Sequence, residues 1–147
     1  MELKESMIRL NQSFINKEDA IRAAGQLLVD DGDVEEEYID SMLAREEVVS
    51  THMGNFIAIP HGTDEGKDKV KATGISVIQV PFGVDFAPDE PEEKMAMMVF
   101  GIAGIGNEHL DLLSKIAVVC SDMDSVVRLV NATSAQEIIA IFEEAEV

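Results

Sequence analysis

The feature that most constrains the fold is a nearly continuous apolar run over residues 95–103, with the sequence Met-Ala-Met-Met-Val-Phe-Gly-Ile-Ala. Its length is that of an ordinary strand and too short for a helix that crosses a bilayer. A strand with one solvated face alternates apolar and polar side chains, whereas this run is apolar at almost every position. It therefore predicts a central strand whose sheet is covered on both faces.

Helices and further strands alternate around this run. Apolar residues at helical spacing predict helices over residues 17–30, 33–45, 107–120, 121–130 and 134–142. Short apolar runs predict strands over residues 56–59 and 75–80, and the opening residues 3–10 are expected to dock at an edge of the fold. The polar segment 63–70 predicts a surface loop or a single helical turn, with Lys67 and Lys69 solvated.

Several residues mark where these elements should begin and end. Asn16 is expected to cap the first helix, and Asp33, with Glu36 three residues later, to cap the second. The turn Pro81-Phe-Gly83 is expected to end the strand before it, because proline cannot donate to a continuing ladder. Ser134, with Glu137, predicts a capping box on the last helix.

The interleaving of helices and strands, without a repeat, a linker or a break in composition, predicts an α/β fold with one domain over residues 1–147. Several connections are too short for the crossovers that parallel strands require. We therefore expect a mixed parallel and antiparallel sheet of about five strands, flanked by helices on both faces.

The formal net charge of −18 makes nucleic acid and anionic membrane surfaces poor partners, whereas a basic protein surface would be attracted. Cys120 is the single cysteine, so neither a disulfide within the chain nor a cysteine metal cluster can form. The first residues lack a basic region followed by an apolar one, and no apolar run reaches membrane-spanning length. The expected location is the cytoplasm, without export or membrane insertion.

His61 is the first candidate for chemistry. It follows the predicted strand 56–59 and lies between Pro60 and Gly62, of which the glycine allows backbone angles that other residues resist. A side chain at a strand end is held by a rigid scaffold and still faces solvent or a cleft. The position therefore suits a reactive group as well as an ordinary histidine in a turn.

Two other residues are expected near the same end of the sheet. His109 falls in the first turn of the helix that follows the central strand, with Asn107 as its cap, where open α/β sheets place ligand groups and free backbone N–H groups favour anions. Arg45 ends the second predicted helix, just before the histidine strand, and its planar cation suits a phosphoryl group.

Three chemistries remain open for the histidines. A metal site from His52, His61 and His109 would need convergent ligands, but no HExxH or HxH pairing supports it. Acid–base catalysis on a small molecule is possible, although no cofactor motif accompanies it. In the third, His61 is a nucleophile that accepts a phosphoryl group, with Arg45, His109 and the Thr63 hydroxyl around the phosphoryl oxygens.

The segment Ile57-Ala-Ile-Pro-His-Gly-Thr63, preceded by Met53-Gly54 and followed by Asn107-Glu-His109, resembles the phosphorylated-histidine signature of a known family. That family is the mannitol/fructose class of IIA components of the bacterial phosphoenolpyruvate:sugar phosphotransferase system. Arg45, within residues 42–47, matches the family's active-site arginine. The resemblance runs from about Ile15 to Ile141.

The resemblance implies a phosphohistidine carrier with a mixed sheet between helices and with neither a cofactor nor a metal. His61 would accept the phosphoryl group through Nε2 from the phosphohistidine of the carrier protein HPr and pass it to a cysteine of a sugar-specific IIB component. The IIC membrane component would take part indirectly, by transporting the sugar that is phosphorylated. By the same resemblance, His109 is the second active-site histidine, Arg45 stabilises the phosphate, and Thr63 belongs to the phosphate-binding signature.

Within the class, Phe82-Gly-Val-Asp-Phe86 and Gly104-Ile-Gly-Asn-Glu-His109 look most like the mannitol components. A fructose-type IIA, or the nitrogen-related regulatory homologue that signals through its phosphorylation state, is the alternative. The acidic loop over residues 87–93 is longer than the family pattern requires.

Overall fold

A five-stranded mixed sheet forms the centre of the computed structural model, which describes residues 3–146. The strand order is β1-β4-β5-β3-β2. The strands are β1 (Ile8–Arg9), β2 (His52–Gly54), β3 (Ile57–Ala58), β4 (Gly74–Asp85) and β5 (Met95–Ala103). β5 pairs antiparallel with β4 and parallel with β3, while β1 joins β4 in parallel and β2 joins β3 antiparallel. The prediction of a mixed sheet of about five strands is confirmed.

β5 is the central strand that its apolar run predicts. Met98, Phe100 and Ile102 belong to the core on one face of the sheet, and Val99 and Ala103 belong to the core on the other. All of these side chains are buried, because both faces of the strand are covered.

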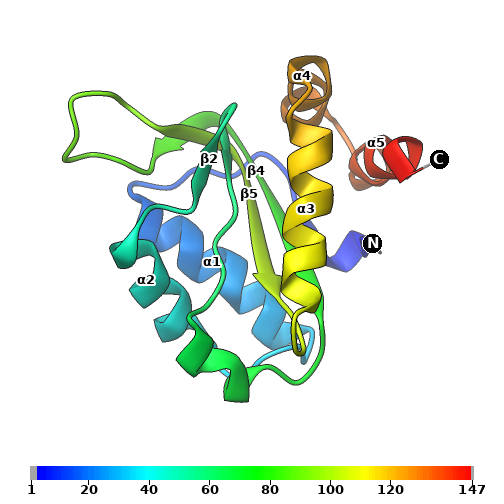
Figure 1. The fold of residues 1–147 in the computed structure, drawn as a ribbon. Coiled ribbons are helices and arrows are strands. Elements are labelled where there is room, and N and C mark those ends of the chain that lie inside the picture. Colours follow the sequence, from blue (N-terminus) through cyan, green and yellow to red (C-terminus); the bar gives the residue numbers. More distant parts are fainter. Residues whose placement is uncertain (1–2, 147) are drawn as a thin grey trace.

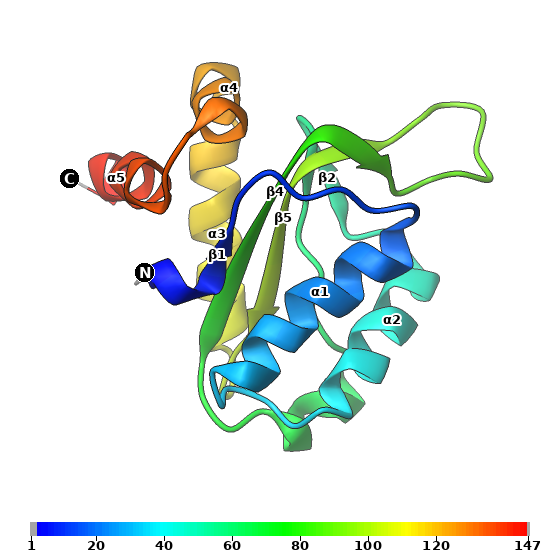
Figure 2. The same cartoon turned by 180° about the vertical axis from the view of Figure 1, so that it is seen from behind.

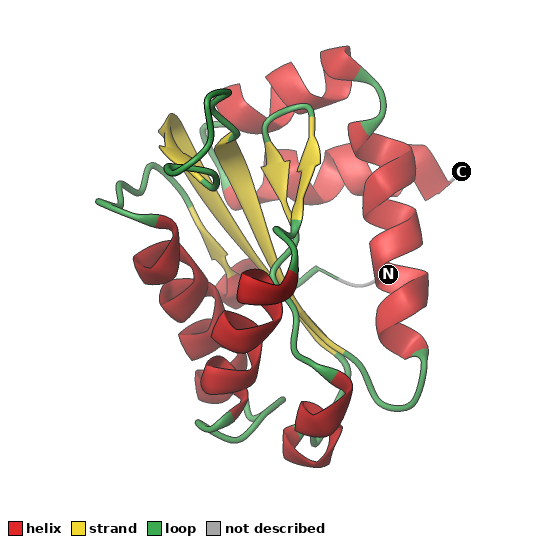
Figure 3. Ribbon diagram, turned by 60° about the vertical axis from the view of Figure 1, so that its left-hand side comes forward, coloured by secondary structure: helices red, strands yellow, loops and turns green. Residues whose placement is uncertain are grey.

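Helices form a layer on each face of this sheet (Figures 1, 2 and 3). α1 (Lys17–Asp30) and α2 (Tyr38–Val48) supply one layer, whose core they share with β4 and β5. α3 (Glu108–Cys120), α4 (Met123–Asn131) and α5 (Ala135–Glu146) supply the other. Two short 3-10 helices, η1 (Glu5–Met7) and η2 (Asp64–Lys69), precede β1 and follow β3. In Figure 1, the segment after β3 runs between α2 and α3 to η2. No helix within residues 3–146 is long and apolar enough to cross a membrane.

α1 begins and ends as its sequence predicts. The Asn16 side chain accepts a hydrogen bond of 2.9 Å from the Asp19 N–H. At the other end, Gly32 has a φ of 81°, and the N–H groups of Gly32 and Asp33 donate to the carbonyls of Val29 and Leu28. This is a Schellman motif, in which the residue with positive φ lets the last helical carbonyls find donors.

The predicted cap at Asp33 is wrong. α2 begins at Tyr38, and the acidic run 35–37 precedes it instead of filling its first turn. The Asp33 N–H closes the Schellman motif, its carbonyl accepts from the N–H groups of Lys71 and Ala72, and its side chain is buried. These contacts hold Asp33 in the connection between the helices, away from the start of α2.

Two strand boundaries also differ from the prediction. β3 contains only Ile57 and Ala58, because Phe56 has a φ of 66° and is 42% exposed in the turn from β2. β4 continues through Pro81 to Asp85, with an irregular register between Gln79 and Val84. A bulge of this kind leaves ladder positions unpaired, so proline is tolerated there and the strand resumes beyond it.

The cap of α5 is present in altered form. The Ser134 hydroxyl accepts from the Glu137 N–H at 3.2 Å, as predicted. The Glu137 carboxylate reaches back to the N–H and hydroxyl of Thr133, one residue before the position that a standard capping box uses.

Candidate active site

His61 lies just after β3, where the chain runs beside the end of β5. It forms an isolated parallel bridge with Ile102, whose N–H donates to the Pro60 carbonyl at 3.0 Å. The side chain is half-buried. The predicted position at a strand end is confirmed. The end of β5 holds this turn from one side.

One ring nitrogen of His61 is engaged by the protein itself. Nδ1 lies 2.8 Å from the carbonyl oxygen of Ile59. Because a carbonyl can only accept, Nδ1 carries the proton and Nε2 keeps its lone pair. Burial lowers the pKa of His61, and the charges of Arg45 and His109 act in the same direction, against the Ile59 carbonyl and Glu46. The lowered pKa favours a neutral ring near pH 7, with the lone pair on Nε2.

His109 reaches the same place from the other helical layer. Its ring and that of His61 are stacked, with centroids 6.4 Å apart and planes 28° from parallel. The loop before α3 is tight, since a Cβ at Gly104 would lie 2.2 Å from the His109 backbone nitrogen. Only glycine allows the end of β5 to come this close to the start of the helix.

Thr73, and not the expected cap residue Asn107, holds this loop. The Thr73 hydroxyl donates to the Glu108 carboxylate at 2.6 Å and accepts from the Ile105 N–H at 3.0 Å. The side chain of Asn107 makes no capping hydrogen bond. The start of α3 is thereby tied to the residue just before β4.

One face of α2 lies along the turn that carries His61. The Tyr38 hydroxyl accepts from the Gly62 N–H and donates to the Ile102 carbonyl, both at 2.9 Å. The Ser41 hydroxyl accepts from the Thr63 N–H at 2.8 Å and lies 3.0 Å from the Thr63 hydroxyl. Gly62 has no positive φ, and its role is close approach, because a Cβ there would lie 2.6 Å from the Tyr38 ring.

Arg45 continues this face of α2, since residues three and four apart lie on one side of a helix. α2 extends three residues beyond it, to Val48, so Arg45 lies in the last turn and not at the end as predicted. Its Nη1 donates to the Val49 carbonyl at 2.8 Å, and the side chain is half-buried. Arg45 is near enough to depress the pKa of His61 by its charge.

Glu46, beside Arg45, is a buried carboxylate that the sequence did not single out. One of its oxygens accepts from the N–H and hydroxyl of Thr51, at 2.8 and 2.6 Å, and the other lies 3.3 Å from the Lys17 ammonium. It ties the connection after α2 to the body of the protein. Two adjacent glutamates, Glu46 and Glu47, lie in the last turn of the helix, and the sequence gave no signal for which of them is buried.

A hollow of about 20 Å³ lies between the two histidines. His61, Thr63, His109 and Lys67 are among its lining residues, together with Tyr38, Gly62, Asp64, Val70 and Gly104. Lys67 was expected to be solvated, and its side chain is 43% exposed, while η2 places it in the lining of this hollow. The hollow is too small to enclose a sugar.

His52 does not join the other two histidines. One of its nitrogens, Nε2, donates to the Met95 carbonyl at 2.8 Å, and Nδ1 accepts from the Gly54 N–H at 3.2 Å. Within residues 3–146, no group of three histidine, cysteine, aspartate or glutamate side chains could hold a metal. The geometry gives the three-histidine metal hypothesis no support, and it leaves His52 in a structural position.

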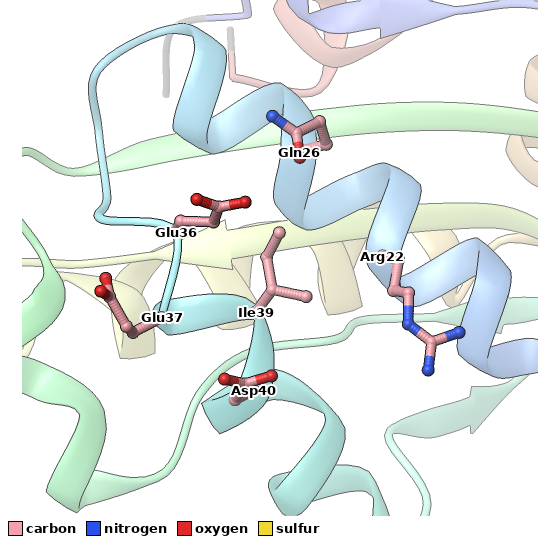
Figure 4. A pocket seen from close by; sticks show the side chains of 6 residues that line it. All are labelled: Arg22, Gln26, Glu36, Glu37, Ile39 and Asp40. Carbon is pink, nitrogen blue, oxygen red and sulfur yellow. The ribbon is translucent and has the colours of Figure 1, made fainter.

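A wider groove of about 450 Å³ lies between α1 and α2 (Figure 4). Its lining residues are Arg22, Gln26, Glu36, Glu37, Ile39 and Asp40. None of the four predicted site residues is among them. The wider groove is therefore separate from the hollow that His61 and His109 line.

Comparison with known proteins identifies the family to which this chain belongs. Residues 1–145 match the family model described as "Phosphoenolpyruvate-dependent sugar phosphotransferase system, EIIA 2". A mannitol-specific phosphotransferase enzyme IIA component of Bacillus subtilis is 53% identical over 97% of this chain and 96% of its own length. The corresponding component of Enterococcus faecalis is 56% identical over 89% of this chain and 90% of its own length.

Solved structures share the fold. Mannitol IIA from Escherichia coli has a TM-score of 0.90 and 39% identity, covering 97% of this chain and 99% of that one. The IIA chain of its complex with phosphorylated IIB has a TM-score of 0.91 and 38% identity, covering 97% and 98%. The nitrogen regulatory protein IIA-Ntr from Neisseria meningitidis has a TM-score of 0.80 and 31% identity, covering 95% and 94%. This chain belongs to the EIIA 2 family and is a phosphotransferase component of the phosphoenolpyruvate-dependent sugar phosphotransferase system.

Proposed function

We propose that residues 1–147 act as one IIA domain that carries a phosphoryl group on Nε2 of His61, from phospho-HPr to a cysteine of a mannitol-specific IIB component. The observation that carries this proposal is the hydrogen bond from Nδ1 to the Ile59 carbonyl. It fixes the tautomer in which Nε2 has a free lone pair. His61 also lines the small hollow together with His109.

The transfer consists of two displacements at phosphorus. In the first, the Nε2 lone pair of His61 forms the new N–P bond while the bond from phosphorus to the HPr histidine breaks and leaves its electron pair on that imidazole. In the second, a cysteine thiolate of IIB forms an S–P bond, and the electron pair of the broken N–P bond returns to Nε2. No oxidant or cofactor is needed, so positioning and charge supply the catalysis.

The neighbours of His61 supply the charge and the hydrogen-bond donors in this proposal. Arg45 would exchange its bond to the Val49 carbonyl for a phosphoryl oxygen, which is the stronger, charge-assisted acceptor. His109, stacked beside His61, would donate from its ring. If Ser41 donates to Thr63, the Thr63 hydroxyl hydrogen remains free for a phosphoryl oxygen.

The choice of partners follows from the relatives. Two relatives named mannitol-specific are 53% and 56% identical to this chain, and mannitol IIA from Escherichia coli is 39% identical, whereas the nitrogen regulatory protein is 31% identical. The solved complex of a similar IIA with phosphorylated IIB supports IIB as the acceptor. Exposed apolar side chains flank two site residues, Val48 and Val49 after Arg45 and Ile105 and Leu110 around His109, as protein docking requires. We place the exchange in the cytoplasm, with the IIC component acting downstream.

The test follows label from phosphoenolpyruvate through enzyme I and HPr to this chain. We expect an acid-labile, base-stable phosphate that is absent from His61→Ala and present in His52→Ala, the matched loss of a histidine outside the hollow. His109→Ala and Arg45→Ala should slow transfer by roughly 10- to 1,000-fold, the range for loss of one charge-stabilising donor, with smaller effects on thermal stability. Label on His61→Ala would overturn the proposal.

A second measurement separates the alternatives within the class. The phosphorylated chain is mixed in turn with a mannitol IIB and a fructose IIB. Faster transfer to the mannitol protein supports the proposal, whereas faster transfer to the fructose protein favours a fructose-type IIA. Transfer to neither would favour the regulatory homologue.

A further inference from the structure

We propose that Tyr38 is a positioning residue for phosphoryl transfer, because its hydroxyl joins α2, the His61 turn and the end of β5 at one point. The inference rests on the proposed carrier function and deepens it. Tyr38 carries no charge toward the phosphoryl group, and it acts through the backbone on either side of His61.

Both hydrogen-bonding functions of the hydroxyl are used, and both partners flank His61. The hydroxyl accepts from the N–H of Gly62, the next residue, and donates to the carbonyl of Ile102, the bridge partner of His61. The Tyr38 side chain is only 4% exposed. Burial raises the pKa of Tyr38, so the phenol keeps the proton that it donates.

The ring of Tyr38 also limits where the turn can lie. A Cβ on Gly62 would come within 2.6 Å of the ring, so the backbone rests directly on it. On the other side, the Ile102 N–H donates to the Pro60 carbonyl. His61 is therefore held between two fixed neighbours, and its ring is oriented from this backbone through the bond to Ile59.

Removing the hydroxyl would release this arrangement without changing the charge of the site. The Gly62 N–H and the Ile102 carbonyl would lose their shared partner in a buried place, and the turn would move to satisfy them. A displacement of about 1 Å at a reacting group can cost about 100-fold in rate. A residue that only stabilised the fold would not have this effect on the chemical step.

The test compares Tyr38→Phe with Ser76→Ala. Each variant removes one buried hydroxyl that donates to a backbone carbonyl at 2.9 Å, but the Ser76 hydroxyl bonds to Ala24 in α1 and does not line the hollow. We expect Tyr38→Phe to lower kcat for transfer from phospho-HPr by 10- to 100-fold, with KM changed less than twofold. The control should lose comparable stability and keep its kcat. The nitrogen chemical shifts of His61 should change only in Tyr38→Phe.

Tyr38 is the single tyrosine of the chain, which provides a second measurement in a protein that keeps its aromatic ring. Incorporated 3-fluorotyrosine gives one fluorine resonance, and phosphorylation of His61 should shift it. The inference is overturned if Tyr38→Phe transfers within twofold of the wild-type rate, if both variants slow in parallel, or if this resonance does not respond. Absence of label on wild-type His61 would instead overturn the carrier function itself.

Discussion

At the scale of single residues, two lysines on η2 differ in where they lie. Lys67 lines the hollow beside His61, and its ammonium is 3.8 Å from the Asp64 carboxylate. Lys69 lies 3.8 Å from Glu35 and 3.9 Å from Asp68, and it is not part of the lining. The two side chains are similarly exposed, 43% and 37%, so they form a matched pair.

We predict that Lys67→Gln destabilises the phosphorylated form and that Lys69→Gln does not. A solvent-exposed charge pair is worth at most about 1 kcal/mol, so the equilibrium of phosphoryl exchange with HPr should shift about three- to fivefold toward HPr. Phosphorus NMR of the exchanging mixture measures this ratio. Equal shifts in the two variants would mean that only the overall charge matters.

The positions of His61 and His109 in the fold could be predicted from the sequence. His61 and His109 each follow an apolar run that ends at a glycine or proline, and these runs are adjacent strands of the sheet. Lys67 could not be found in this way, because a six-residue 3-10 helix leaves no periodicity to show which side chains turn inward. The row of Tyr38, Ser41 and Arg45 had the right spacing, but nothing in the sequence showed which segment it faces.

At the scale of elements, the connection between α1 and α2 contains a carboxyl group, that of Asp33, whose charged form is disfavoured by burial. One oxygen of Asp33 is buried without a hydrogen-bond partner, and a Cβ on Gly74 would lie 2.1 Å from it. Burial, followed by the neighbouring Asp31, raises the pKa of Asp33 to about 6. The folded state therefore binds the Asp33 proton more tightly than the unfolded chain does, in which the pKa of this carboxyl group is 3.8.

We predict that Asp33→Asn flattens the pH dependence of stability. With a raised pKa, the contribution of the protonated group is fully present below pH 3.8 and is lost as the pH rises through about 6. The wild type should lose up to about 3 kcal/mol of unfolding free energy from this group between those limits. Urea unfolding at pH 4, 5 and 7 measures it.

Asp40→Asn, an exposed change of the same charge on α2, is the control and should keep the wild-type slope. Comparison with the wild type cancels the other titrating groups. Among them is His61, whose lowered pKa acts oppositely and removes stability as the pH falls below its ordinary value of 6.5. A variant that keeps the full slope would show that Asp33 does not titrate in this range.

Long periodic elements were predictable and their boundaries were less so. β5, α1 and α3 were predictable because the spacing of their apolar residues fits only one type of secondary structure. The predictions for the start of α2 and the end of β4 were wrong, because in each case tertiary contacts overrode a local sequence signal. Asp33 can cap a helix, but its N–H donates to the Leu28 carbonyl and its carbonyl accepts from the N–H groups of residues 71–72. Pro81 can end a strand, but β5 continues alongside it through a bulge.

At the scale of the whole molecule, the net charge of −18 governs how partners approach. A basic docking surface is attracted over about a Debye length, which falls from about 30 Å at 0.01 M salt to about 8 Å at 0.15 M. Bond-making within the assembled complex feels much less of this field. The charge should therefore accelerate the encounter and leave the chemical step unchanged.

We predict that kcat/KM for transfer from phospho-HPr falls about 10-fold or more between about 0.01 and 0.15 M salt, while kcat stays within about twofold. Stopped-flow measurements at matched pH separate the two parameters. Sucrose at equal osmolality is the control, because it changes viscosity without screening charge. A kcat/KM that does not depend on salt would contradict electrostatic steering.

The volume of the hollow beside His61 has a consequence for how a cell could direct phosphate among its sugars. A hollow of about 20 Å³ is too small to enclose a hexitol, so in the proposed transfer the sugar is bound by another protein. In the proposed transfer, the choice of acceptor then depends on which protein fits the surface around the hollow and can bring a cysteine to Nε2. Substituting a few side chains of that surface would direct the phosphoryl group to the acceptor for another sugar and leave the reacting atoms unchanged.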